Sequence, residues 1–266
     1  MTRRSPSSGA ARPWAASGAK AALVRLASMA LLVALWQGAA SLAQNPALPA
    51  PGAVLGFVLR EALQGDLLAN LAATLGRVIA AFVLAMAVGM ALGIAFGRRA
   101  GLNLALDPWL VLLLNTPALV ITVLCYIWLG LTETAAVLAV ALNKIPNVTV
   151  LLREGTRALS GELDEMAAAF RLSFLDRLRH IVLPQLEPYV AGAARSGLSL
   201  VWKIVLVVEL LGRPNGVGYA ISVYFQLFDV TAVIGYALSF MGVMLAVEYG
   251  LLQPFEAHAR RWRPAA

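Results

Sequence analysis

Charged and amide side chains stand inside long apolar segments of this chain. Asn143 and Lys144 lie in one such segment, Lys203 and Glu209 in another, and Asn115 in a third. A charge at membrane depth is costly and usually faces a charged partner or a polar cavity. If these segments cross a membrane, Asn143, Lys144 and Lys203 predict a path that favours an anion.

The same residues also have a structural interpretation. Lys144 or Lys203 could pair with Glu209, and the remaining charges could extend to the membrane surface. Lys203 and Glu209 are six residues apart and do not share a helix face, so we do not expect a direct pair within one helix. Asn115 could bond to a carbonyl that Pro117 leaves without an N–H donor. Both interpretations stay open.

No group of residues in the sequence is suited to covalent or metal chemistry. Cys125 is the only cysteine, so a disulfide framework is impossible. Neither His180 nor His258 has a nucleophile or metal ligand beside it in the sequence. The phosphate-binding pattern GxxxxGK[ST] is also absent, so ATP hydrolysis would have to occur on another chain. We therefore expect no enzyme activity, no metal and no cofactor.

The composition is typical of an integral membrane protein. The 266 residues are 60% hydrophobic and 13% charged, whereas a soluble domain carries roughly 25% charged residues. A formal charge of +7 would suggest nucleic-acid binding in a soluble protein, but basic cytoplasmic loops explain it in a membrane protein. We expect an all-α protein surrounded by membrane lipid, without a nucleic-acid partner.

Six apolar segments are long enough to cross a bilayer, which takes about 20 residues. The expected spans are residues 21–43, 71–96, 104–129, 134–152, 188–211 and 231–253. With the N-terminus in the cytoplasm, most Arg and Lys outside the spans fall on the cytoplasmic side, and only Arg60 and Arg213 fall opposite. This asymmetry predicts six spans with both termini in the cytoplasm.

The N-terminal region has two interpretations. Residues 1–20 are rich in Ser, Ala, Pro and Arg, which predicts a disordered cytoplasmic tail ahead of a membrane domain over residues 21–266. The alternative is a cleavable signal peptide, with Ser41-Leu-Ala43 as a possible cleavage site.

Smaller signals lie elsewhere in the chain. Residues 53–63 predict a short helix on the membrane surface. Residues 219–228 predict a second short helix, which either lies on the surface or enters the membrane partway. Gly89, Gly93 and Gly97 have four-residue spacing, which predicts a small-residue ridge for close helix packing within the chain.

The loop of residues 153–188 is polar between two apolar spans and is expected to contact a soluble partner. Its pattern predicts two short helices. The first covers residues 161–170, with an apolar face formed by Leu163, Met166, Ala167 and Phe170. The second begins at Ser173, which has capping-box spacing with Asp176. Pro184 is expected to end it and to start the turn back into the membrane.

This loop resembles the EAA loop of permease subunits in bacterial binding-protein-dependent ABC importers. The family pattern is Glu-Ala-Ala, a spacer, Gly, a longer spacer and Ile-x-Leu-Pro. Arg171 stands where the family has glycine, which makes the bend between two short helices. A left-handed bend disfavours a residue with a Cβ by about 1 kcal/mol or more, so Arg171 either tolerates this strain or the bend differs. The matching residues are Glu165, Ala167, Ala168 and Ile181-Val-Leu183-Pro184.

Further fragments resemble the nitrate, sulfonate and taurine branch of this family, and they occur in its order and spacing. They are Leu48-Pro-Ala-Pro-Gly-Ala-Val-Leu55, Asn70-Leu-Ala-Ala-Thr-Leu-Gly-Arg77, and Trp202-Lys203 with Glu209 before Gly216-Val-Gly218-Tyr219. The resemblance covers nearly the whole chain after the first 20 residues. It implies the transmembrane domain of a type I ABC importer in a bacterial inner membrane.

The resemblance also implies partners and roles. The loop would dock its coupling helices into a cytoplasmic ATP-binding subunit, and a periplasmic solute-binding protein would deliver the substrate to a dimer, here expected to be a homodimer. The residues expected at the ATPase contact are Glu165, Ala167, Ala168, Phe170, Arg171, Leu172, Phe174, Leu183 and Pro184. Those expected on the translocation path are Asn115, Asn143, Lys144, Lys203 and Glu209.

Other functions remain as alternatives. An ATP-independent secondary carrier or channel would be expected to show an internal repeat or acidic ion sites, and neither is evident. A membrane enzyme would need a catalytic cluster, and the polar loop could instead be a linker that packs under the membrane helices. The expected substrate is a small anion such as a sulfonate, taurine or nitrate. Whether the dimer joins like or unlike subunits stays open.

Overall fold

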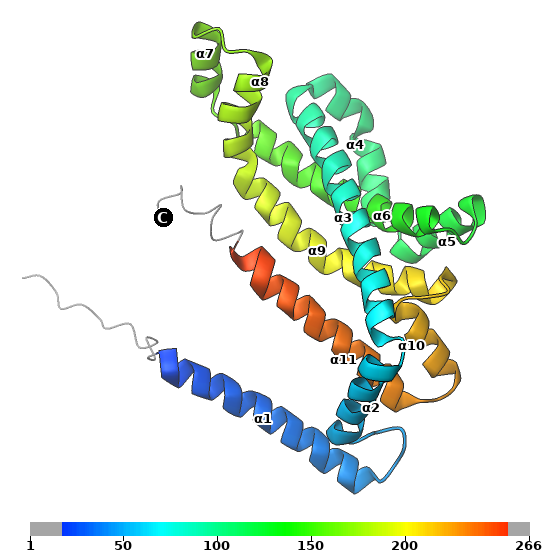
Figure 1. Ribbon diagram of the computed structural model, residues 1–266. Helices are drawn as coiled ribbons and strands as arrows, with labels where there is room; N and C mark the ends of the chain where they lie inside the picture. The colour runs from blue at the N-terminus through cyan, green and yellow to red at the C-terminus, as the bar shows by residue number, and fades with distance from the viewer. Residues whose placement is uncertain (1–17, 255–266) are drawn as a thin grey trace, which may run out of the picture.

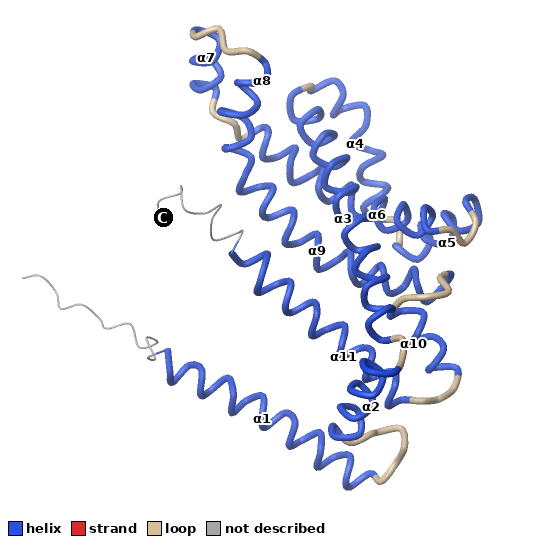
Figure 2. Tube along the Cα trace, viewed as in Figure 1, coloured by secondary structure: helices blue, strands red, loops and turns tan. Residues whose placement is uncertain are grey.

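The computed structural model describes residues 18–254, and every regular element in that part of the chain is a helix (Figure 1). Short loops join these helices (Figure 2). Residues 1–17 of the predicted tail and the basic C-terminal residues within 255–266 lie outside the described residues. Residues 18–20, which the sequence predicts to belong to the tail, instead form the start of helix α1 (Gly18–Ala43). The helices are α1 (Gly18–Ala43), α2 (Pro51–Gln64), α3 (Leu67–Arg98), α4 (Ala100–Asn115), α5 (Ala118–Leu129), α6 (Glu133–Arg157), α7 (Gly161–Ala169), α8 (Phe174–Arg177), the π-helix η1 (Leu178–Val182), α9 (Leu183–Gly212), α10 (Val217–Gln226), α11 (Val230–Val247) and the π-helix η2 (Glu248–Leu252).

Two apolar clusters hold the bundle together around α3, α6 and α9. The larger joins these helices to α5, α10 and α11, with Val140, Val201 and Tyr236 fully buried in it. The smaller joins α3, α6, η1 and α9 near the polar loop, with Leu152 and Leu186 fully buried. The base of the polar loop is therefore anchored in a packed core.

The glycine ridge of α3 brings its backbone close to α6. A Cβ at Gly93 would lie 2.6 Å from the Cβ of Leu152 and 2.8 Å from the carbonyl oxygen of Thr149. Gly89 and Gly97 meet Val148 and Thr156 of α6 in the same way. The predicted close packing within the chain is confirmed, and small residues are what such packing requires in a membrane.

Four helices among the described residues are long and apolar enough to cross a membrane, or five if one bent pair counts as a single span. The four lie at Lys20–Ala43, Leu67–Arg98, Glu133–Arg157 and Val230–Gly250, and the bent pair is α4 with α5. These positions match five of the six expected spans. The remaining one coincides with α9, whose role as a span stays a prediction.

The third expected span is sharply broken near Pro117. Helices α4 and α5 meet there with a bend of 99°. Asn115 donates from Nδ2 to the carbonyl of Val111 at 2.8 Å, and Thr116 donates from Oγ1 to that of Leu112 at 2.9 Å. The carbonyl that Pro117 leaves without its usual donor is that of Leu113, and it accepts the N–H of Thr116 at 3.3 Å. The bond expected of Asn115 to that carbonyl is therefore not formed.

The two short segments outside the spans are helical, as predicted. The first, expected over residues 53–63, lies in α2, and the second, expected over 219–228, lies mostly in α10. Helix α1 stands at the edge of the bundle (Figure 1), and Trp36 donates from Nε1 to the carbonyl of Pro49 at 3.0 Å. This bond ties α1 to the loop before α2.

Candidate functional site

The polar loop carries two short helices at one end of the bundle (Figure 1). The first, α7, ends at a bend in which Arg171 has φ of 51°. The N–H of Arg171 bonds to the carbonyl of Ala168 at 3.1 Å, and the N–H of Leu172 bonds to that of Ala167 at 3.0 Å. This pair of bonds is a Schellman motif, whose left-handed position usually holds glycine. The bend is therefore kept, and Arg171 tolerates the strain.

Replacing Arg171 with glycine is expected to stabilise this bend by about 1 kcal/mol, because glycine adopts a positive φ without a Cβ penalty. Transport is expected to persist in this variant. Hydrogen–deuterium exchange over residues 161–177 should show slower exchange than in the wild type. Arg179→Gly is the matched control: Arg179 lies within η1, where glycine is expected to speed exchange. Faster exchange in Arg171→Gly would contradict the assignment.

The tip of the loop exposes large apolar side chains. Phe170 is 75% exposed and Leu175 is 72% exposed, and Met166 and Leu172 are also exposed. Ala167 instead faces inward with 2% exposure, and Glu165, Ala168 and Arg171 are exposed. The side chain of Phe174 lies outside the described part of the structure. An apolar group rimmed by charges is typical of a protein contact.

The second short helix begins as predicted but does not end at Pro184. The N–H of Asp176 bonds to Oγ of Ser173 at 3.2 Å, and this hydroxyl donates to Oδ2 of Asp176 at 2.6 Å. The chain then stays helical from α8 through η1 into α9, and Pro184 stands in the first turn of α9 beside Leu183. The predicted end at Pro184 is wrong because proline is tolerated in a first helical turn. The wider turn of η1 precedes it, where the N–H of Leu183 bonds to the carbonyl of Leu178.

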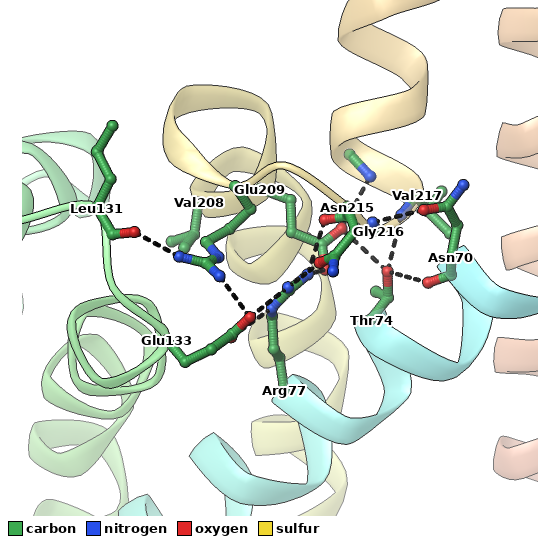
Figure 3. A network of polar contacts seen from close by, with 12 residues as sticks. Asn70, Thr74, Arg77, Leu131, Glu133, Val208, Glu209, Asn215, Gly216 and Val217 are labelled. Atoms are coloured by element: carbon green, nitrogen blue, oxygen red, sulfur yellow. Dashed lines mark hydrogen bonds and ion pairs between the residues drawn. The ribbon is translucent and has the colours of Figure 1, made fainter.

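A buried polar network joins α3, α6 and α9 (Figure 3). It lies near the end of α9 away from the loop, because Glu209 is close to Gly212, the last residue of that helix. Arg77 of α3 donates from Nη1 to Oε1 of Glu209 at 2.6 Å and from Nη2 to Oε1 of Glu133 at 2.7 Å. Glu209 is fully buried and Arg77 is 6% exposed. The predicted alternative in which a lysine pairs with Glu209 is therefore wrong, because Arg77 occupies that carboxylate.

The network also holds the glycine-rich turn between α9 and α10. The N–H groups of Gly216 and Val217 bond to Oδ1 of Asn70 at 2.7 Å and to Oγ1 of Thr74 at 2.9 Å. Thr74 in turn donates to Oε2 of Glu209 at 3.0 Å, and Gly218 donates its N–H to the same oxygen at 2.9 Å. The turn and α3 are thus bonded through buried groups (Figure 3).

The sequence predicts that Glu209 lies on the translocation path, but it assigns no role to Arg77, Thr74 or Asn70. One signal could have found them. Residues 70, 74 and 77 follow each other at spacings of four and three in an apolar segment, which puts their side chains on one helix face. A polar stripe in a membrane helix indicates a polar partner inside the protein.

The remaining predicted path residues lie in different surroundings. Lys144 is 1% exposed, and its Nζ has no hydrogen-bond partner within the described residues. Its side chain lies against α9, since a Cβ at Gly197 would be 2.6 Å from Cε of Lys144. Asn143 is half-buried and donates to the carbonyl of Ala139 at 2.8 Å, whereas Lys203 and Asn115 are exposed. The polar groups thus lie both inside the bundle and on its surface.

The sequence matches one family model and known permease proteins. Residues 85–252 match the family model described as binding-protein-dependent transport system inner membrane component. An aliphatic sulfonates transport permease protein of Escherichia coli (strain K12) is 30% identical over 164 residues, which span 60% of this chain and 60% of that protein. A riboflavin transport system permease protein of Chloroflexus aurantiacus is 30% identical over 237 residues and 88% of each chain.

The fold has solved counterparts as well. A structure of the MetNI methionine ABC transporter in an inward-facing conformation superposes with a TM-score of 0.65 at 15% identity. The match covers 76% of this chain and 99% of the other. At this identity the likeness concerns the fold alone, and it includes nearly all of the matched chain.

Proposed function

The chain belongs to the binding-protein-dependent transport system inner membrane component family, and on that premise we propose that it is the permease subunit of an ABC importer. It moves a small solute into the cytoplasm, and a separate cytoplasmic ATP-binding subunit hydrolyses the ATP. The main support for this proposal is the structure of the polar loop, whose tip exposes apolar side chains and whose base is packed in the core. We call residues 153–188 the coupling loop.

The coupling loop has the features that docking to a moving partner requires. Phe170, Leu172 and Leu175 supply apolar surface, while Glu165 and Arg171 supply charges that fix register. Helices α6 and α9 carry the loop at the end of a packed core, so a displacement of the tip reaches the membrane helices. Ala167, Ala168, Phe174, Leu183 and Pro184 complete the proposed contact or support it.

The proposed orientation follows from charge. With the coupling loop in the cytoplasm, the Arg77–Glu209 network and the turn before α10 lie toward the periplasmic side of a bacterial inner membrane. Both termini are then cytoplasmic. A periplasmic solute-binding protein delivers the solute, and two copies of the chain form a homodimer around the path.

We propose that the solute is an anion, such as a sulfonate, taurine or nitrate. Two lysines at membrane depth support this proposal, Lys144 inside the bundle and Lys203 on its surface. Asn143 adds an amide next to Lys144 in the sequence, and Asn115 is proposed to lie on the path as well. Glu209 supports the path through its bond to Arg77. The name of the sulfonate permease relative agrees with this class.

Reconstitution in liposomes tests the permease assignment. The chain, its ATP-binding subunit and its solute-binding protein are purified together, and uptake of labelled solute is measured with and without ATP. Uptake is expected only with ATP, and it should disappear when the ATP-binding subunit cannot hydrolyse ATP. Uptake that persists with the inactive ATPase would instead support an ATP-independent carrier or channel.

The substrate proposal has a separate test. Calorimetry on the partner solute-binding protein measures its affinity for sulfonates, taurine and nitrate, with neutral molecules of similar size as controls. Binding of the sulfonates, taurine or nitrate, which all carry an anionic group, and not of the uncharged molecules is expected. Preference for the neutral molecules would overturn the substrate class and leave the permease assignment intact.

A further inference from the structure

The two ends of the coupling loop meet at one side chain of α9. Gln185 accepts a hydrogen bond at Oε1 from the N–H of Ser160 at 2.9 Å. Its Nε2 donates to the carbonyl of Ile181 at 3.0 Å. Ser160 immediately precedes α7, and Ile181 lies in η1, directly before α9. A single half-buried carboxamide therefore connects the start of the loop to its return into the bundle.

We propose that Gln185 is a positioning residue that makes the coupling loop and α9 move as one rigid body. This inference rests on the proposed permease function, because its purpose is to pass a displacement from the ATP-binding subunit to the membrane helices. Gln185 does not touch the partner or the solute in this role. It acts through the two backbone groups to which it is bonded.

Apolar packing holds the base of the loop in place but does not hold the start of α7. The hydrogen bond between Ser160 and Gln185 is therefore needed there. Val182 and Leu186, on either side of Gln185, are fully buried. One turn further, the ring of Tyr189 lies against Gly155 of α6, where a Cβ would be 2.6 Å from its Cγ. By contrast, α7 has only Ala167 buried among its described side chains. Apolar contacts therefore hold the base of the loop to the bundle, whereas the start of α7 is joined to α9 by the hydrogen bond from Ser160 to Gln185.

Only a glutamine side chain makes both bonds from this position. A carboxamide offers one acceptor oxygen and a donor nitrogen, whereas a carboxylate only accepts. Glutamate could keep the bond from Ser160 but not the bond to Ile181. Methionine has a similar length but has neither group, so it removes both bonds with little change in shape.

The test compares Gln185→Met, Gln185→Glu and wild type in the full complex with its ATP-binding subunit and solute-binding protein in liposomes. The readout is the amount of solute transported per ATP hydrolysed. We expect Gln185→Met to lower this ratio roughly tenfold, from the loss of two hydrogen bonds, with basal ATP hydrolysis and complex assembly unchanged. Gln185→Glu is expected to fall between Gln185→Met and wild type.

Gln64→Met is the matched control, because Gln64 is an exposed glutamine in α2. Its ratio should equal that of the wild type. A wild-type ratio in an assembled Gln185→Met complex would overturn the inference. If Gln185→Met does not assemble with its partners, hydrogen–deuterium exchange of the Ser160 amide in the permease alone decides.

A second measurement separates this inference from the permease proposal. Hydrogen–deuterium exchange of the Ser160 amide in the permease alone should be faster in Gln185→Met than in Gln185→Glu and wild type. Equal exchange in all three would remove the proposed link, whatever the transport result. Faster exchange together with no ATP-driven uptake by the wild type would contradict the permease function and keep the link.

Discussion

Arg77→Met is expected to remove most of the folded permease. The substitution leaves the carboxylate of Glu209, which is fully buried, without its cationic partner. Removing one member of a buried ion pair costs roughly 3–5 kcal/mol, a large part of the 5–15 kcal/mol by which proteins are typically stable. The yield of monodisperse protein and its unfolding temperature in detergent measure this loss.

Two control variants test whether the unpaired carboxylate of Glu209 is the cause of the lost stability. Arg60→Met removes the same charge at an exposed position of α2 and is expected to leave the unfolding temperature nearly unchanged. The double variant Arg77→Met with Glu209→Met should be more stable than Arg77→Met alone, because it leaves no carboxylate of Glu209 unpaired. A wild-type unfolding temperature in Arg77→Met would show that the network does not stabilise the fold.

Glu165→Arg is expected to separate ATP hydrolysis from transport. Glu165 is exposed on α7 beside the apolar tip, so the reversed charge should leave the permease folded. In the docked complex it would face groups that suit a carboxylate, and juxtaposed like charges cost several kcal/mol. Solute uptake should therefore fall at least about tenfold, while ATP hydrolysis continues.

The measurements are uptake, ATP hydrolysis and co-purification of the ATP-binding subunit in the same preparation. Glu165→Gln removes the charge without reversing it and should show a smaller loss. Wild-type coupling in Glu165→Arg would show that this face of α7 does not meet the partner.

Local features of the coupling loop were predictable because they follow from residues close in sequence. The bond between Ser173 and Asp176 and the end of α7 before Arg171 depend only on neighbouring residues. Pro184 shows the limit of such rules. Its missing N–H breaks a helix interior, but here the π-turn before it makes its position the start of a helical segment.

The partners of intramembrane charges were not predictable from one sequence. Arg77 and Glu209 are separated by 132 positions, and no local pattern states which of several cations reaches a given carboxylate. The sequence also does not indicate that Lys144 lies against Gly197. The spacing of Asn70, Thr74 and Arg77 does predict a polar face, but only the arrangement of helices identifies what that face meets.

Helix α9 runs from the coupling loop to the buried network, so its length determines how far each of its residues moves if the helix rotates. Helix α9 has 30 residues, which correspond to about 45 Å. If the bond of Glu209 to α3 acts as a pivot near one end of α9, Gln185 lies 24 residues from it, near the other end. Gly197 is 12 residues from that pivot, so a rigid rotation moves it about half as far as Gln185. The part of α9 that contacts the Lys144 side chain would thus move about half as far as the part next to the coupling loop. The residues around Glu209 would move little.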